Sequence, residues 1–249
     1  MTGTANAIPA GEACTFQLPP DPRCASLARS LLAETMSTLM LPGRLIDDAK
    51  LSVSELATNA HVHAGQPAVP PELWIWARTR PRPELVISIF DTSRSALPTT
   101  AETDLLAEHG KGLGIVAALS SETGAHFTRS RLACAPVRGK AVWFAIPLPA
   151  TWPDCLVAPA HAAQRLLLAL QQRGIHTVCR SDDIGISVIT AGQLNVWVEH
   201  RAFSWRQSKG YTHQPLIDVQ ETAEQIVGHI EAGRSIRHLL PRPPREPTR

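Results

Sequence analysis

The chain has 249 residues, of which 44% are hydrophobic and 18% are charged, and its formal net charge is +2. This composition excludes an intrinsically disordered chain and leaves room for two globular domains. The near-neutral charge gives no argument for direct nucleic-acid binding, so none is expected.

The sequence predicts a soluble protein whose cysteines are reduced. No apolar stretch is long enough to cross a membrane, and the polar opening 1–6 lacks the basic and apolar segments of a signal peptide. We therefore expect a cytoplasmic protein that does not bind membranes. The five cysteines are odd in number and never form a Cys-x-x-Cys pair, which argues against a disulfide framework and a structural zinc site.

The first part of the chain mixes helical and extended patterns. Apolar residues recur at helical spacing in some segments and alternate with polar residues in others. These patterns predict strands at 13–18, 72–79, 84–90, 125–131 and 139–147, and helices at 23–40, 44–65 and from the glycine-rich segment 108–116 through 121.

The proline-rich stretch 147–153 predicts a domain boundary. It separates a first domain at 12–149 from a smaller α+β domain at 155–233, whose role the sequence does not indicate. A basic, proline-rich tail at 234–249 is expected to be disordered. In the second domain, the patterns predict helices at 159–173 and 218–232 and strands at 177–180, 184–190, 194–199 and 203–206.

One predicted helix carries polar residues at a regular step. Glu55, Asn59 and His63 are four residues apart, so they lie along one face of the helix. The glycine-rich segment holds Gly110, Gly112 and Gly114 before an apolar helix, where backbone amides could bind an anion. On its own this segment is a weak signal, because it matches neither the P-loop nor the dinucleotide-binding pattern.

Three segments occur in a fixed order: the helix with Glu55 and Asn59, a strand that ends at Asp91, and the glycine-rich loop. Together they resemble the GHKL ATPase superfamily, and they are most similar to its bacterial anti-sigma-factor serine/threonine kinases over residues 12–149. The resemblance implies an α/β (α+β two-layer sandwich) fold of the Bergerat type. In that fold a mixed or antiparallel sheet is covered by helices on one face. The implied cofactors are ATP and Mg²⁺.

The resemblance also implies roles for single residues. Asn59 would coordinate Mg²⁺ at the ATP phosphates, and Glu55 would be the general base for the attacking hydroxyl or water. Asp91 would accept a hydrogen bond from the adenine amino group, and residues 94–109 would form a lid. His63 is a candidate on the magnesium side, with a histidine bonded within the fold as the alternative. The remaining candidates for nucleotide contact are Ser93, Gly110, Lys111, Gly112, Leu113 and Gly114.

One departure from the family pattern bears on affinity. Ala141 stands where a threonine hydroxyl often supports the adenine contact. The loss of one neutral hydrogen bond costs about 0.5–1.5 kcal/mol, which predicts roughly tenfold weaker ATP binding.

The sequence leads to a first hypothesis of an ATP- and Mg²⁺-binding anti-sigma-type serine/threonine kinase. It would control transcription through a protein partner, either a sigma factor or an anti-anti-sigma-like protein. The alternative is a non-catalytic, nucleotide-gated protein-binding module. A metabolic ATPase or ligase is a third hypothesis, for which the sequence offers no acceptor site. Assembly as a homodimer stays open.

Overall fold

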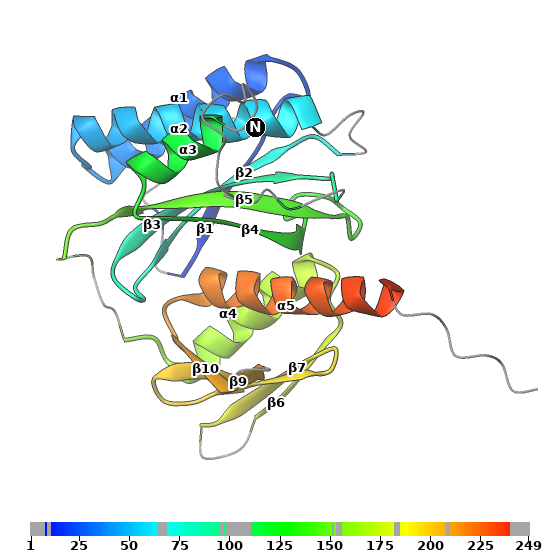
Figure 1. The fold of residues 1–249 in the computed structure, drawn as a ribbon. Helices are drawn as coiled ribbons and strands as arrows, with labels where there is room; N and C mark the ends of the chain where they lie inside the picture. Colours follow the sequence, from blue (N-terminus) through cyan, green and yellow to red (C-terminus); the bar gives the residue numbers. More distant parts are fainter. Residues whose placement is uncertain are drawn as a thin grey trace, which may run out of the picture.

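The computed structural model describes residues 8, 11–63, 69–94, 97, 111–150, 152, 156–181, 185–207 and 210–239, with only the backbone described for Lys111 and 234–239. These residues form five helices and two antiparallel five-stranded sheets. Figure 1 shows four layers: a layer of helices, the first sheet, a second layer of helices, and the second sheet. The predicted α+β class is confirmed. We call residues 8–150 the N-terminal half and residues 156–239 the C-terminal half.

The first sheet belongs entirely to the N-terminal half. Its strand order is β1-β2-β3-β5-β4, and every neighbouring pair is antiparallel. The hairpin predicted between the second and third strands is present. The strands are β1 (Ala13–Gln17), β2 (Glu72–Arg78), β3 (Glu84–Asp91), β4 (Glu122–Arg129) and β5 (Arg138–Pro147).

Three helices cover one face of this sheet: α1 (Arg23–Thr38), α2 (Gly43–His63) and α3 (Lys111–Leu119). The alternation of β3 explains the core beneath them, because successive side chains of a strand point to opposite faces. Leu85, Ile87 and Ile89 join the helix-facing core together with the buried side of α2.

The opposite face of the first sheet is also covered, which the resemblance did not imply. Val86 and Phe90 of β3 point to this face and pack with Trp74 and Trp76 of β2. Helix α5 (Val219–Leu239) crosses beneath them, and the Trp76 indole donates a hydrogen bond of 3.1 Å to Glu221 of this helix. The first sheet is therefore buried on both faces.

The C-terminal half forms its own core between its sheet and its helices α4 and α5. The strand order is β10-β9-β8-β7-β6, all antiparallel. The additional elements are α4 (Pro159–Gln172), β6 (Thr177–Ser181), β7 (Ser187–Ala191), β8 (Leu194–Val198), β9 (Ala202–Gln207) and β10 (Gly210–Pro215).

Several observed elements differ from the sequence predictions. Strand β10 was not predicted, and β4 begins at Glu122, three residues before the predicted start at 125. Helix α5 continues to Leu239, so the first residues of the predicted tail, 234–239, are helical. The rest of that tail lies outside the described residues.

Candidate functional site

Helix α2 carries the predicted polar stripe. Val53, Leu56 and Ala57 bury one side of the helix against the first sheet, which leaves Glu55 and Asn59 at its partly buried edge and His63 exposed at its end. Within the described residues, none of the three stripe side chains forms a hydrogen bond or an ion pair. The stripe therefore presents an uncommitted carboxylate and carboxamide one turn apart.

The start of α3 lies directly against this stripe. A Cβ atom added to Gly112 would overlap the carboxylate Oε2 of Glu55, so the backbone of α3 approaches Glu55 so closely that a side chain at position 112 would displace this carboxylate. The first amides of a helix have no acceptor within it, so the N-terminus of α3 is suited to an anion. The structure thus brings the predicted glycine segment and the predicted base together.

The other candidates of this segment have different surroundings. Leu113 is partly buried and packs against the core under α2. Nothing lies within 4 Å of a Cβ added to Gly114, so space does not require glycine there. Gly110, the side chain of Lys111 and most of the predicted lid lie outside the described residues.

Asp91 ends β3 on the same side of the sheet as the stripe. It is 3% exposed, and its Oδ1 accepts a hydrogen bond of 2.8 Å from the backbone amide of Ser93. The Lys140 ammonium lies 3.4 Å from the same oxygen. Burial raises the pKa of the Asp91 carboxyl, while the charge of Lys140 and the Ser93 amide oppose the shift, and His63 adds a smaller opposing effect.

Lys140 is the site residue that the sequence patterns missed. It stands opposite Asp91 in the antiparallel register of β3 and β5, so the two side chains share a face. Oδ1 accepts the Ser93 amide and is the carboxylate oxygen nearest the Lys140 ammonium, whereas Oδ2 accepts no hydrogen bond from the described residues. The neighbouring Gly139 permits this arrangement, because a Cβ there would overlap the carbonyl oxygen of Asp91.

The sequence interpretation of Ala141 was wrong. Ala141 pairs with Phe90, one step from Asp91, and its side chain lies in the cluster on the opposite face with Trp74 and Trp76. Adjacent residues of a strand point to opposite faces. Ala141 therefore does not contact the edge where Asp91 and the stripe lie, and the weaker binding predicted from it has no structural basis.

The first residue of the predicted lid contacts the C-terminal half. Arg94 Nη1 lies 3.2 Å from Glu231 of α5 and donates to the Gly139 carbonyl at 3.3 Å. Its guanidinium carbon lies 4.4 Å from the centre of the Phe127 ring. The chain segment that follows Asp91 is thus anchored to α5 through Arg94.

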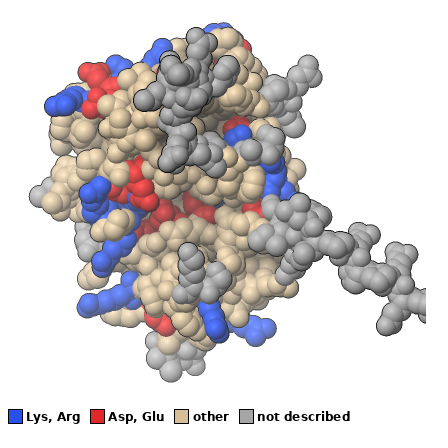
Figure 2. All heavy atoms as spheres, viewed as in Figure 1, with Lys and Arg blue, Asp and Glu red and all other residues tan. Residues whose placement is uncertain are grey.

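A second group of charged residues is buried between the two halves. Glu224 of α5 forms ion pairs with Arg131 at 2.8 Å and with Arg173, and the His126 ring nitrogen lies 3.0 Å from it. Burial raises the pKa of Glu224, but the two arginines outweigh it and hold this pKa well below its usual value. Figure 2 shows acidic side chains along the junction of the two halves, with basic side chains beside them. These internal pairs hold the halves together.

Comparison with protein-family models and with curated proteins finds no match for this chain. Among the described residues, no helix is both long and apolar enough to cross a membrane.

Proposed function

We propose that this chain is an ATP- and Mg²⁺-binding regulatory protein that phosphorylates a serine or threonine of a protein partner, in the manner of the anti-sigma kinases that it resembles. The observation that carries the proposal is the corner formed by Glu55, Asn59 and the start of α3. Its polar side chains have no partners among the described residues, and Asp91 lies on the same side of the sheet. A Bergerat fold for the N-terminal half is part of this proposal.

Each part of the corner has a chemical role in this proposal. The Asn59 carboxamide oxygen is a hard ligand suited to Mg²⁺, which keeps most of its other positions for phosphate and water. The first amides of α3 bind phosphate oxygens. Asp91 accepts the adenine amino hydrogen at Oδ2, the carboxylate oxygen that accepts no hydrogen bond from the described residues.

Glu55 is the proposed general base. It lies one helical turn before Asn59 and against α3, so a hydroxyl placed at the phosphate end of the nucleotide can come within its reach. A carboxylate in this position accepts the hydroxyl proton as the oxygen attacks the terminal phosphorus, and ADP leaves. The partner, a sigma factor or an anti-anti-sigma-like protein, supplies the hydroxyl in the cytoplasm.

Binding is tested by calorimetric titration of ATP with and without Mg²⁺. We expect Asn59→Ala to abolish most of the Mg²⁺-dependent affinity, a loss of at least about tenfold, because one metal ligand is removed. Thr58→Ala is the matched control, since Thr58 is an exposed neighbour on the same helix. Equal Mg²⁺-dependent affinity of the Asn59→Ala and wild-type proteins would contradict the proposed site.

Catalysis is tested separately with Glu55→Gln and radiolabelled ATP. The variant should bind Mg²⁺-ATP like the wild type. It should transfer phosphate to the partner at least about 100-fold more slowly, because general-base catalysis contributes that factor or more. Unchanged transfer by Glu55→Gln would refute the base.

The contact of Arg94 with Glu231 favours a second candidate function, a nucleotide-gated binding module. It links the segment after Asp91 to α5, so a change in that segment on nucleotide binding can reach the C-terminal half. This candidate predicts that wild-type protein binds Mg²⁺-ATP, transfers no phosphate, and changes its affinity for the partner. The transfer assay decides between the two functions.

A further inference from the structure

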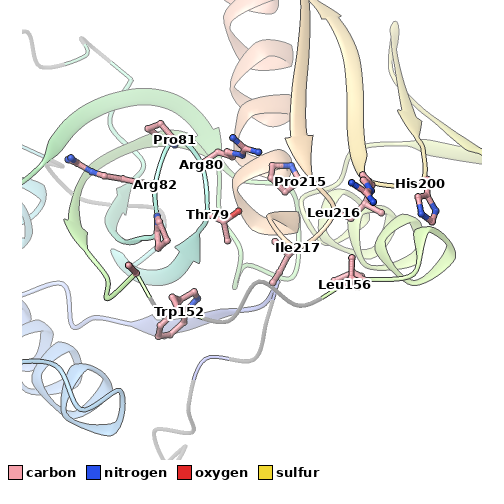
Figure 3. A pocket seen from close by; sticks show the side chains of 14 residues that line it. Thr79, Arg80, Pro81, Arg82, Trp152, Leu156, His200, Pro215, Leu216 and Ile217 are labelled. Carbon is pink, nitrogen blue, oxygen red and sulfur yellow. The ribbon is translucent and has the colours of Figure 1, made fainter.

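A cavity of about 590 Å³ lies at the junction of the two halves, away from the nucleotide corner. Its described lining comes from four places: the turn between β2 and β3, residues 150, 152, 156 and 157 before α4, the turn between β8 and β9, and the turn between β10 and α5 (Figure 3). The β2–β3 turn precedes β3, whereas Asp91 ends it, so the cavity and Asp91 are separated by the length of that strand, about 23 Å.

The floor of the cavity is apolar. Leu216 and Ile217 are almost fully buried and form its base, and Trp152 and Leu156 stand at its side (Figure 3). Its size falls in the range of small-molecule sites, and pockets of this kind are common where two domains meet. The apolar floor fits a hydrocarbon or aromatic body.

The rim of the cavity is cationic. Arg80 comes from the N-terminal half and Arg201 from the C-terminal half, and His200 stands beside Arg201. Among the described residues that line this cavity there is no Asp or Glu. Arg82 is paired with Glu84 at 2.9 Å, but within the described residues neither Arg80 nor Arg201 has a carboxylate at ion-pair distance.

The two arginines also border an adjoining cavity of about 670 Å³, in which the carboxylates of Glu122 and Glu221 are paired with Arg78. Because no described carboxylate lies at ion-pair distance from Arg80 or Arg201, an anion placed between them gains the attraction of both guanidinium charges. Guanidinium groups bind carboxylates and phosphates through paired hydrogen bonds.

From this arrangement we propose that the cavity binds an amphipathic anion, a carboxylate or phosphate joined to an apolar body. The anionic group lies between Arg80 and Arg201, and the apolar body lies on Leu216 and Ile217. Because the ligand contacts both halves of the folded chain and not the unfolded chain, its binding raises the melting temperature. The site is independent of the proposed nucleotide site.

The test uses three probes that contain eight carbon atoms each and differ in the head group: octanoate, octyl phosphate and octylammonium. Calorimetry and thermal melting of the full chain are expected to show binding and stabilisation by the two anions and not by the cation. The ratio of the two anion affinities identifies the preferred head group. Saturating Mg²⁺-ATP should not displace the anion, which separates this site from the nucleotide site.

Arg80→Ala and Arg201→Ala should each weaken anion binding about tenfold, because each removes one charge-assisted contact. Both side chains are exposed, so the folded structure should tolerate their loss. Arg206→Ala, an exposed arginine of β9 that does not line the cavity, is the control and should bind like the wild type. Equal binding of octanoate and octylammonium, no anion binding, or equal effects of all three substitutions would overturn the proposal.

Discussion

Asp91 is a buried carboxylate that the proposed function requires to accept a hydrogen bond. Burial disfavours the charged form and raises the pKa of the Asp91 carboxyl, and the Lys140 ammonium and the Ser93 amide oppose this effect at Oδ1. The side chain can therefore stay an acceptor at Oδ2 while its neighbour oxygen is occupied. This division of the two oxygens is what the adenine contact in the proposed function requires.

The substitution Asp91→Asn tests that division. It keeps the size of the side chain but replaces one carboxylate oxygen by a donor, so ATP affinity should fall about tenfold. Calorimetric titration measures the effect. Ser88→Ala is the control, because Ser88 lies on the same strand with its side chain on the opposite face. Equal losses in both variants would mean that the effect comes from the strand and not from the carboxylate.

The contrast between Asn59 and Ala141 shows which site residues a sequence can reveal. Glu55 and Asn59 lie on one helix, where a spacing of four residues fixes their common face locally. Whether a residue of β5 shares a face with Asp91 depends on the register between two strands about fifty residues apart, which no local pattern contains. For that reason Lys140 was missed and Ala141 was placed on the wrong face.

At the scale of elements, the contact between α2 and α3 can be tested through its glycines. In Gly112→Ala the new methyl group overlaps the carboxylate of Glu55, the flexible end of a side chain that can swing away. We expect the melting temperature to change by only a few degrees, because alanine favours the helix by roughly 1 kcal/mol. Mg²⁺-ATP binding or phosphate transfer should fall at least about tenfold because Glu55 is displaced.

Gly114→Ala is the matched control for that contact. A methyl group at position 114 meets no other atom, so the substitution should leave nucleotide binding unchanged and keep or raise the melting temperature. If Gly112→Ala retains full binding and transfer, the close approach of α3 to Glu55 has no functional role.

Most elements were predictable because their apolar periodicity is local, as in α2 or in the hairpin of β2 and β3. Strand β10 was not, because its sequence Gly210–Pro215 contains few β-forming residues and its outward residues are polar. It is a strand because its backbone pairs with β9 from Gly210 to Pro215. Pairing of this kind with a preformed edge is a tertiary effect that the segment itself does not encode.

At the scale of the whole molecule, the two halves are joined by buried polar contacts as well as by apolar packing. Arg131 lies over the rings of Trp74 and Trp76 and pairs with Glu224 of α5, and burial lowers its pKa to about 10. Removal of one member of such a buried group leaves an uncompensated charge, which is far more costly than the group is stabilising. The arrangement therefore favours one docking geometry of α5 over others.

The contact between Asp218 and Thr79 joins the start of α5 to the end of β2 and predicts how stability depends on pH. Asp218 accepts hydrogen bonds of 2.9 Å and 3.0 Å from the Thr79 amide and one of 3.0 Å from its hydroxyl. Burial nevertheless raises its pKa to about 6. Between the unfolded pKa of about 4 and this value the folded state binds more protons, so this group's contribution to stability falls as pH rises.

In Asp218→Asn that pH-dependent contribution is absent. The free energy of unfolding of the variant minus that of the wild type should increase by roughly 2 kcal/mol between pH 4 and pH 7, whatever the offset from altered hydrogen bonds. Urea unfolding at several pH values measures this difference, with Asp47→Asn, at an exposed position of α2, as the control. A difference that stays constant over this range would show that Asp218 is ionised as readily in the folded chain as in the unfolded one. The contact between the halves would then be insensitive to acid.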